Sequence, residues 1–312
     1  MDILIQAVLL VAGFIMLIKG ADWFVEGASK IADRFGIPQL VIGLTIVAMG
    51  TSAPEAAVSI TSALKGSAEI TIGNVLGSNI LNVFIILGLT AVVRSIAVQS
   101  STIKYEMPLT IAVTVLLAGL GLADNEISRL EGVILWVVFI GYTIYLLKMA
   151  RAGQSTVEEV AETEKKDPMW KLLVLVIIGV VLIVWGSDVT VNAATALAKI
   201  FGMSERLIGL TIVALGTSLP ELVTSVTAAI KGKADIAVGN VVGSNIFNIL
   251  FVVGTTALIT PVAYSAGFVV DSIVAIAAMV LLLVFVIPRK KLNRPAGIVM
   301  LVCYAGYFIY LI

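Results

Sequence analysis

A six-residue motif, Gly-Thr-Ser, one variable residue and Pro-Glu, occurs twice, at 50–55 and 216–221. In each copy the glutamate follows the threonine by four residues, so on a helix the carboxylate and the hydroxyl share a face. Both glutamates, Glu55 and Glu221, fall within long apolar segments, where an ionised carboxylate costs about 3 kcal/mol. This cost points to a bound cation at each glutamate. The alternative is a protonated glutamate that is hydrogen-bonded and holds helices together.

Each motif also places a proline in an apolar segment, Pro54 in the first copy and Pro220 in the second. Because proline has no backbone N–H, Pro54 leaves the carbonyl of Gly50 without its helical partner, and Pro220 does the same to Gly216. Broken helices are tolerated at membrane depth only where they are buried in protein or line a wet cavity. We therefore expect two broken helices whose freed carbonyl oxygens are available to a hard cation.

A second motif, Gly-Asn-x-x-Gly-Ser-Asn-x-x-Asn, occurs at 73–82 and 239–248. Residues spaced by four share a helix face, which gives two strips of neutral oxygens, Asn74, Ser78 and Asn82, and Asn240, Ser244 and Asn248. With two carboxylates, hydroxyls and freed carbonyls, they form the all-oxygen environment that calcium prefers and soft metals do not. The alternative is hydrogen bonding between helices, which applies most to Asn74, Asn79, Asn240 and Asn245.

The overall composition indicates that the solvent is lipid. Apolar residues make up 60% of the 312 residues, charged residues only 13%, and the mean hydropathy is +1.10, whereas soluble domains are about a quarter charged. Lys plus Arg equals Asp plus Glu at 20 each, so no excess charge points to nucleic acid or an acidic partner. Histidine is absent, which excludes the Ser-His dyad of an intramembrane protease. The single cysteine, Cys303, cannot form an internal disulfide.

Apolar blocks of about 17 to 25 residues predict an all-α integral membrane protein with about ten spanning helices. One long polar stretch divides the chain into a first unit at 1–148, a linker at 149–168 and a second unit at 169–312. The units are copies, because residues 43–93 align without gaps on 209–259 and more than half of the positions are identical. Five spans per copy is an odd number, so the second copy enters the membrane from the opposite side. We therefore expect two inverted five-helix repeats.

Basic residues in the predicted loops indicate the orientation. With the N-terminus outside, the outside loops hold only Lys65, Arg129, Lys199 and Arg206. The inside loops then hold Lys30, Arg34, Arg94, Lys104, Lys148, Arg151, Lys165, Lys166, Lys171, Lys231, Lys233, Arg289, Lys290, Lys291 and Arg294. This excess is the positive-inside pattern, which predicts that both termini lie outside and that the linker is cytoplasmic.

The two motifs and the repeated plan resemble the calcium/cation antiporter superfamily, and in particular the prokaryotic sodium/calcium exchangers. The resemblance covers nearly the whole chain and implies alternating access around a central ion site, with Glu55 and Glu221 as the principal calcium ligands. It further implies that sodium or calcium is bound by Thr51, Thr217, the backbone carbonyls of Ala48 and Ala214, and the side chains of Ser52, Ser78, Ser218, Ser244, Asn82 and Asn248. Several family members carry an aspartate at one position matching Asn82 or Asn248, whereas this chain has asparagine at both.

The expected function is therefore secondary active antiport of Ca²⁺ against Na⁺ across the cytoplasmic membrane of a prokaryote. The alternative is an H⁺-driven Ca²⁺ exchanger, because the same glutamates could carry protons. A channel is a different class of protein, and inverted repeats with broken helices favour alternating access over a continuous pore. We expect no enzymatic activity and no cofactor. The expected partners are inorganic cations and the lipid bilayer, without nucleic acid or an obligate protein partner.

Overall fold

The computed structural model describes residues 3–68, 70–154, 167–202 and 214–311, which are almost entirely helical. Within this part of the chain, eight helices are long and apolar enough to cross a membrane. Five of them are α1 (Ile3–Phe35), α8 (Arg129–Gln154), α9 (Met169–Ile200), α15 (Gly267–Val286) and α16 (Arg294–Leu311). The expectation of an all-helical membrane protein is confirmed.

The other three long helices each contain a π-helical turn. They are α5 (Ile70–Leu81), η2 (Asn82–Leu87) and α6 (Gly88–Val93); η3 (Thr102–Glu106) and α7 (Met107–Asp124); and α13 (Ala234–Phe247), η5 (Asn248–Val253) and α14 (Gly254–Ile259). The π turns η2 and η5 begin at Asn82 and Asn248, which are equivalent positions of the sequence repeat. Such turns widen the helix locally and are frequent at functional sites.

A ninth candidate span is broken at the first Gly-Thr-Ser-x-Pro-Glu motif. The chain passes through α2 (Gln39–Ile42), η1 (Gly43–Val47) and α3 (Ala48–Thr51), and then bends by 48° at Ser52 into α4 (Ala53–Leu64). Ser52 has φ −82° and ψ 6°, outside the helical range, and Pro54 lies in the first turn of α4, where its missing N–H breaks no helical bond. The predicted break is therefore present.

The second motif shows the same break. Helix α11 (Ala214–Thr217) ends at Ser218, which has φ −93° and ψ 5°, and α12 (Leu219–Ile230) follows with its proline in the first turn. The expected seventh span, centred near Ala214, falls partly on residues 203–213, which lie outside the described part of the chain.

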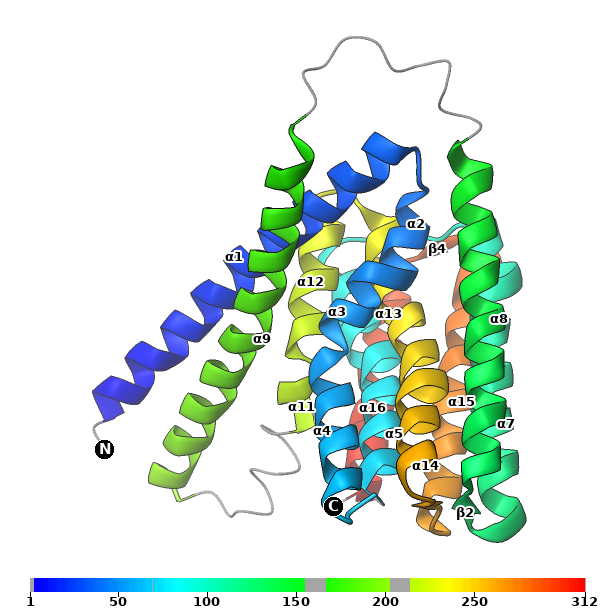
Figure 1. Ribbon diagram of the computed structural model, residues 1–312. Coiled ribbons are helices and arrows are strands. Elements are labelled where there is room, and N and C mark those ends of the chain that lie inside the picture. Colours follow the sequence, from blue (N-terminus) through cyan, green and yellow to red (C-terminus); the bar gives the residue numbers. More distant parts are fainter. Residues whose placement is uncertain (1–2, 69, 155–166, 203–213, 312) are drawn as a thin grey trace.

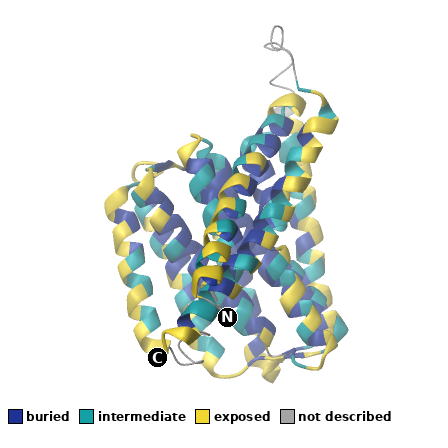
Figure 2. Ribbon diagram, turned by 90° about the vertical axis from the view of Figure 1, so that its left-hand side faces the viewer, coloured by how far each residue is buried: buried dark blue, intermediate teal, exposed yellow. Residues whose placement is uncertain are grey.

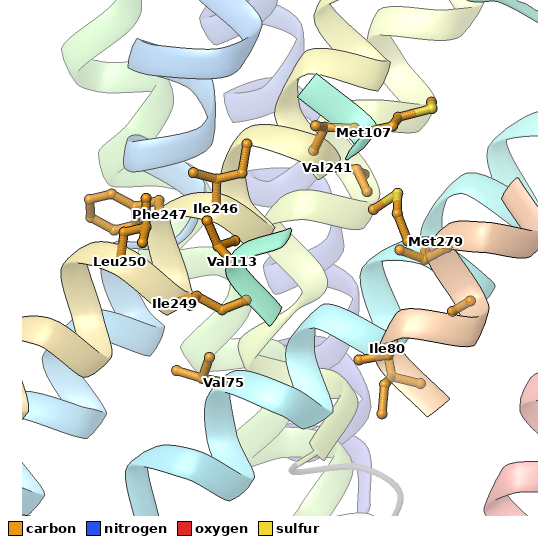
Figure 3. Close-up of a cluster of buried hydrophobic side chains, with 14 of the residues drawn as sticks. Val75, Ile80, Met107, Val113, Val241, Ile246, Phe247, Ile249, Leu250 and Met279 are labelled. Atoms are coloured by element: carbon orange, nitrogen blue, oxygen red, sulfur yellow. The ribbon is translucent and has the colours of Figure 1, made fainter. Parts of the chain in front are cut away.

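The helices that carry the Gly-Asn-x-x-Gly-Ser-Asn-x-x-Asn motif are at the centre of the molecule. In the most apolar stretch of 234–259, 94% of the residues are buried, against 17% in α16. Figure 3 shows Ile246, Phe247 and Ile249 among side chains of neighbouring helices, such as Val113 of α7. Exposed apolar side chains lie on the outer helices, where lipid would cover them (Figure 2). The two Gly-Asn-x-x-Gly-Ser-Asn-x-x-Asn motifs are thus held in the two most buried of the eight long helices.

Helices α1 and α9 pack along one another and lean away from the remaining helices (Figure 1). A Cβ atom added at Gly20 would lie 2.8 Å from the carbonyl oxygen of Gly179, and one added at Gly179 would lie 2.8 Å from the backbone nitrogen of Phe24. Only glycine permits backbones to approach this closely. The two long helices therefore form a tight pair of their own.

Short strands join loops of the first half to loops of the second half. Strand β1 (Ile96–Ala97) pairs antiparallel with β4 (Lys291–Leu292), and β2 (Glu126–Ile127) pairs antiparallel with β3 (Val262–Ala263). Figure 1 shows β4 and β2 at opposite ends of the molecule. The two chain ends lie at the β2 end, whereas the end of α8 and the start of α9 lie at the β4 end (Figure 1).

Candidate functional site

The two broken helices bring their glutamates together across the halves. Glu55 and Glu221 are each only 1% exposed and lie in the first turns of α4 and α12. Ser52 donates a hydrogen bond of 2.8 Å to Oε1 of Glu221, and Ser218 donates one of 3.4 Å to Oε1 of Glu55. The serine at each break therefore contacts the carboxylate of the other half. A helix N-terminus also favours a negative charge at each position.

Four central asparagines connect α5 and η2 with α13 and η5. Asn79 and Asn245 donate to each other's backbone carbonyl oxygens, at 3.1 and 3.2 Å. Asn82 donates to Oδ1 of Asn245 at 2.9 Å, and Asn248 donates to Oδ1 of Asn79 at 3.2 Å. The same set of bonds thus runs in both directions between the halves.

Four oxygens at this centre accept no hydrogen bond from the residues that the structure describes. They are Oε2 of Glu55, Oε2 of Glu221, Oδ1 of Asn82 and Oδ1 of Asn248, and their residues are at most 1% exposed. A buried acceptor without a donor is costly, and native proteins leave few of them. All four atoms carry free lone pairs and occur in equivalent pairs of the repeat. This arrangement fits a cation with oxygen ligands.

Among the described residues, no basic side chain pairs with either of the two carboxylates. None of the ion pairs found in the described residues involves Glu55 or Glu221. The described residues also contain no group of three or more His, Cys, Asp or Glu side chains suited to a metal ion. A cation here would meet two carboxylates and otherwise neutral oxygens, which suits a hard ion such as calcium rather than a soft metal.

The remaining residues implied by the resemblance are placed as follows. Thr51 is buried and donates to Oδ1 of Asn240 at 2.9 Å, and Ser244 donates to the carbonyl oxygen of Ala48 at 3.4 Å. Ser78 is buried in α5. Thr217 is partly buried and lines a cleft of about 650 Å³ between α4, α9 and α11. Ala214 begins α11, and its side chain lies outside the described residues.

Asn74 and Asn240 form hydrogen bonds between helices, which is the alternative to ion binding for these two residues. Nδ2 of Asn74 donates to Ser59 Oγ at 3.0 Å and to the carbonyl oxygen of Glu55 at 3.2 Å. Nδ2 of Asn240 donates to Ser225 Oγ at 2.9 Å and to the carbonyl oxygen of Glu221 at 3.4 Å. These bonds attach each glutamate helix to its neighbour. Sequence reasoning missed the two serines, although each lies four residues after its glutamate in both repeats.

One freed carbonyl has a partner that the sequence did not predict. The oxygen of Gly216, released by Pro220, accepts a hydrogen bond of 2.8 Å from Ser187 of α9. This bond ties the second break to the α1 and α9 pair. The expectation that this carbonyl is simply open to a cation needs this correction, because a side chain already uses one of its lone pairs.

The fold and this centre define a multi-pass helical membrane protein whose broken helices meet at buried, charged and unpaired oxygens, an arrangement typical of ion-coupled transporters. The chain belongs to the sodium/calcium exchanger protein family, whose sequence model matches residues 5–148 and 171–312. It is therefore a transporter and not an enzyme.

Relatives and solved structures of similar length support this assignment. The putative antiporter CaxA of Alkalimonas amylolytica is 44% identical, with 97% of this chain and 98% of the relative covered. The sodium/calcium exchanger MaX1 of Methanosarcina acetivorans is 30% identical, with 99% of each chain covered. A structure of the sodium-calcium exchanger NCX_Mj soaked without Na⁺ and Ca²⁺ aligns with a TM-score of 0.86 at 32% identity, covering 100% of both chains.

Proposed function

We propose that the protein is a secondary active antiporter that exchanges Ca²⁺ for Na⁺ at the centre built by Glu55, Glu221, Asn82 and Asn248. The observation that carries this proposal is the set of four buried oxygens without donors, one from each of these residues. Two carboxylates balance the charge of a divalent ion. The hydroxyls and backbone carbonyls of the surrounding motif residues supply further oxygens toward the six to eight that calcium takes.

Sharing of these oxygens by two ions favours exchange over passive flow of Ca²⁺ through a channel. Sodium is also a hard cation, and it would occupy oxygens that calcium needs. Because both ions depend on the two carboxylates, binding of one excludes full binding of the other. Antiport then follows if the centre opens to one side of the membrane at a time.

For the membrane arrangement, we propose ten spans in two inverted five-helix repeats, 1–148 and 169–312, joined by a cytoplasmic linker at 149–168. Both termini then lie outside the cytoplasmic membrane of a prokaryote. The two termini lie at one end of the molecule, and the end of α8 and the start of α9 lie at the other end (Figure 1). Because both termini lie at the same end, this arrangement supports an even number of spans. The basic residues predicted for the inside loops support the orientation.

The proposed transport requires only the ions, the single chain and a bilayer. The transported ions are Ca²⁺ and Na⁺, without a cofactor, nucleic acid or an obligate protein partner. H⁺-driven Ca²⁺ exchange is the second candidate, and one observation favours it. Glu55 and Glu221 are buried and have no basic partner among the described residues, so protons are one way to neutralise them when calcium leaves.

Flux into vesicles separates these functions. Purified protein in lipid vesicles should take up Ca²⁺ when an outward Na⁺ gradient is imposed, and not when only a pH gradient is imposed at constant Na⁺. Uptake driven by the pH gradient alone would favour the H⁺-coupled exchanger. Calcium flux that needs neither the Na⁺ gradient nor the pH gradient, and no counter-ion, would indicate a channel. That result would contradict both exchange mechanisms. Vesicles without protein serve as the control for leakage of Ca²⁺ through the lipid.

A further inference from the structure

The four central asparagines fall into two kinds according to what their side-chain oxygens contact. Oδ1 of Asn82 and Oδ1 of Asn248 have no donor within the described part of the chain, whereas Oδ1 of Asn79 and Oδ1 of Asn245 each accept an amide N–H from the other half. All four residues are at most 3% exposed, so bulk water does not satisfy these groups. Asn79 and Asn245 belong to none of the ligand positions that the resemblance implies.

The orientation of these amides matters because an asparagine has two unlike ends of similar size. One end is an oxygen with lone pairs, and the other is an NH₂ group that can only donate. A half-turn about the last side-chain bond would direct N–H groups, rather than an oxygen, at a cation. The amide orientation of Asn82 and Asn248 therefore decides whether each attracts or repels the ion.

The hydrogen bonds determine this orientation step by step from the backbone. A backbone carbonyl only accepts, so the amide end that faces the carbonyl of Asn245 must be Nδ2 of Asn79. Oδ1 of Asn79 is then the end that faces Asn248, and Nδ2 of Asn248 must point back to it. This leaves Oδ1 of Asn248 directed away and free. The same sequence of bonds runs from the carbonyl of Asn79 through Asn245 to Asn82.

We propose that Asn79 and Asn245 are positioning residues of the ion site, each fixing the amide of the ligand asparagine in the opposite half so that its oxygen faces the cation. This inference rests on the proposed function, in which Asn82 and Asn248 bind the transported ion. Asn245 acts on Asn82, and Asn79 acts on Asn248. The pairing is specific, and it predicts which residues are coupled in energy.

The test is Ca²⁺ affinity of purified protein by isothermal titration in two double-mutant cycles. Asn245→Ala alone should weaken Ca²⁺ binding about 10-fold or more, the size of effect found when a partner of a metal ligand is removed. Added to Asn82→Ala it should weaken binding little further, because the amide it orients is already gone. Added to Asn248→Ala it should have its full effect. Asn79→Ala should show the reverse pattern. Asn192→Ala, at an exposed position of α9, controls for purification and handling.

A structural role for Asn79 and Asn245 would give a different pattern. Loss of packing would weaken binding equally in the Asn82→Ala and Asn248→Ala backgrounds, and this result would overturn the proposal. The proposed ion site fails separately, if Asn82→Ala and Asn248→Ala themselves leave Ca²⁺ affinity unchanged. Where an alanine variant does not fold, Asn245→Ser and Asn79→Ser are measured in the same cycles, because their hydroxyls remain polar but are too short to replace the amide contact.

Discussion

At the scale of single residues, the centre combines little charge with many neutral oxygens. Of the four unpaired oxygens described above, two are carboxylate oxygens, from Glu55 and Glu221, and two are amide oxygens, from Asn82 and Asn248. A divalent ion would be neutralised by this pair, whereas a third carboxylate would leave excess charge in a buried site. The asparagines at 82 and 248 offer oxygens at this centre without adding charge.

Replacing either glutamate by glutamine tests this balance of charge. Glu55→Gln and Glu221→Gln keep the shape of the side chain but remove one negative charge, so each alone should lower Ca²⁺ affinity by at least about 10-fold, because ligand charge tunes calcium sites over several orders of magnitude. Calcium uptake by vesicles that hold folded protein is the measurement. Glu126→Gln, at an exposed position of β2, is the matched control. If either site variant exchanged calcium at a near wild-type rate, the replaced glutamate would not be part of the ion site.

A second residue-scale prediction concerns pH. Asp167, just before α9, forms ion pairs of 2.7 Å with Lys171 and 2.8 Å with Lys30, and these lower the pKa of its carboxyl from 3.8 to about 2. A lowered pKa in the folded state means that the stabilisation is complete above about pH 4 and is lost as the pH falls toward 2. Between pH 5 and 8 the ion pairs are constant. The pH profile of calcium exchange in Asp167→Asn should therefore have the wild-type shape in that range. A changed profile would show that this junction titrates during transport.

At the scale of elements, two kinds of helical irregularity make the centre. The breaks at Ser52 and Ser218 place serine hydroxyls and glutamate carboxylates at helix N-termini, and the π turns η2 and η5 begin at Asn82 and Asn248. A regular helix would bury its own backbone groups in hydrogen bonds along the whole span. The irregular points of the helices thus coincide with the residues whose side-chain oxygens lack a hydrogen-bond partner in the described part of the chain.

The prolines test the role of the breaks. In Pro54→Ala or Pro220→Ala the backbone N–H returns and lets the helix close through the motif. The serine and the glutamate then move from their present positions, and Ca²⁺ affinity should fall, while the amount of protein in the membrane stays the same. Affinity is measured by titration of purified protein, and membrane insertion by the yield after extraction. Unchanged affinity in both variants would contradict the broken-helix account.

The close packing of α1 on α9 gives a prediction with a matched control. Gly20→Ala would place Cβ 2.8 Å from the oxygen of Gly179, which is backbone and cannot turn aside, so we expect a loss of about 1–3 kcal/mol in stability. At Gly141 of α8 no atom lies within 4 Å of an added Cβ. Gly141→Ala should therefore be neutral or more stable by up to about 1 kcal/mol. Unfolding midpoints in detergent compare the two, and equal effects would argue against the tight pair.

At the scale of the whole molecule, the halves are interlocked at the centre rather than placed side by side. Serines at the breaks, the four asparagines and the strand pairs at both ends all join residues of one half to residues of the other. By contrast, α1 and α9 form a leaning pair beside the rest, connected to it by bonds such as that of Ser187 with Gly216 (Figure 1).

The proposed orientation is tested by labelling single cysteines. With Cys303 replaced by serine, Asp124→Cys lies at the β2 end with the termini, and Arg289→Cys lies near β4 at the end that leads to the linker; both positions are exposed. A membrane-impermeant maleimide added to intact cells should label the cysteine at 124 and not the one at 289. Labelling of the cysteine at 289 should require broken membranes. The opposite result would invert the topology.

The sequence by itself determined which residues could bind a cation and why their helices must break. Proline chemistry, the four-residue spacing on a helix and the length of apolar blocks are local properties, so they can be read without coordinates. Only the tertiary structure decided that Ser52 contacts Glu221, that Asn79 and Asn245 accept hydrogen bonds from asparagines of the opposite half, and that Ser187 bonds to Gly216. These contacts join residues far apart in the chain. They depend on which helix faces pack together, and periodicity along a single helix does not specify its neighbours.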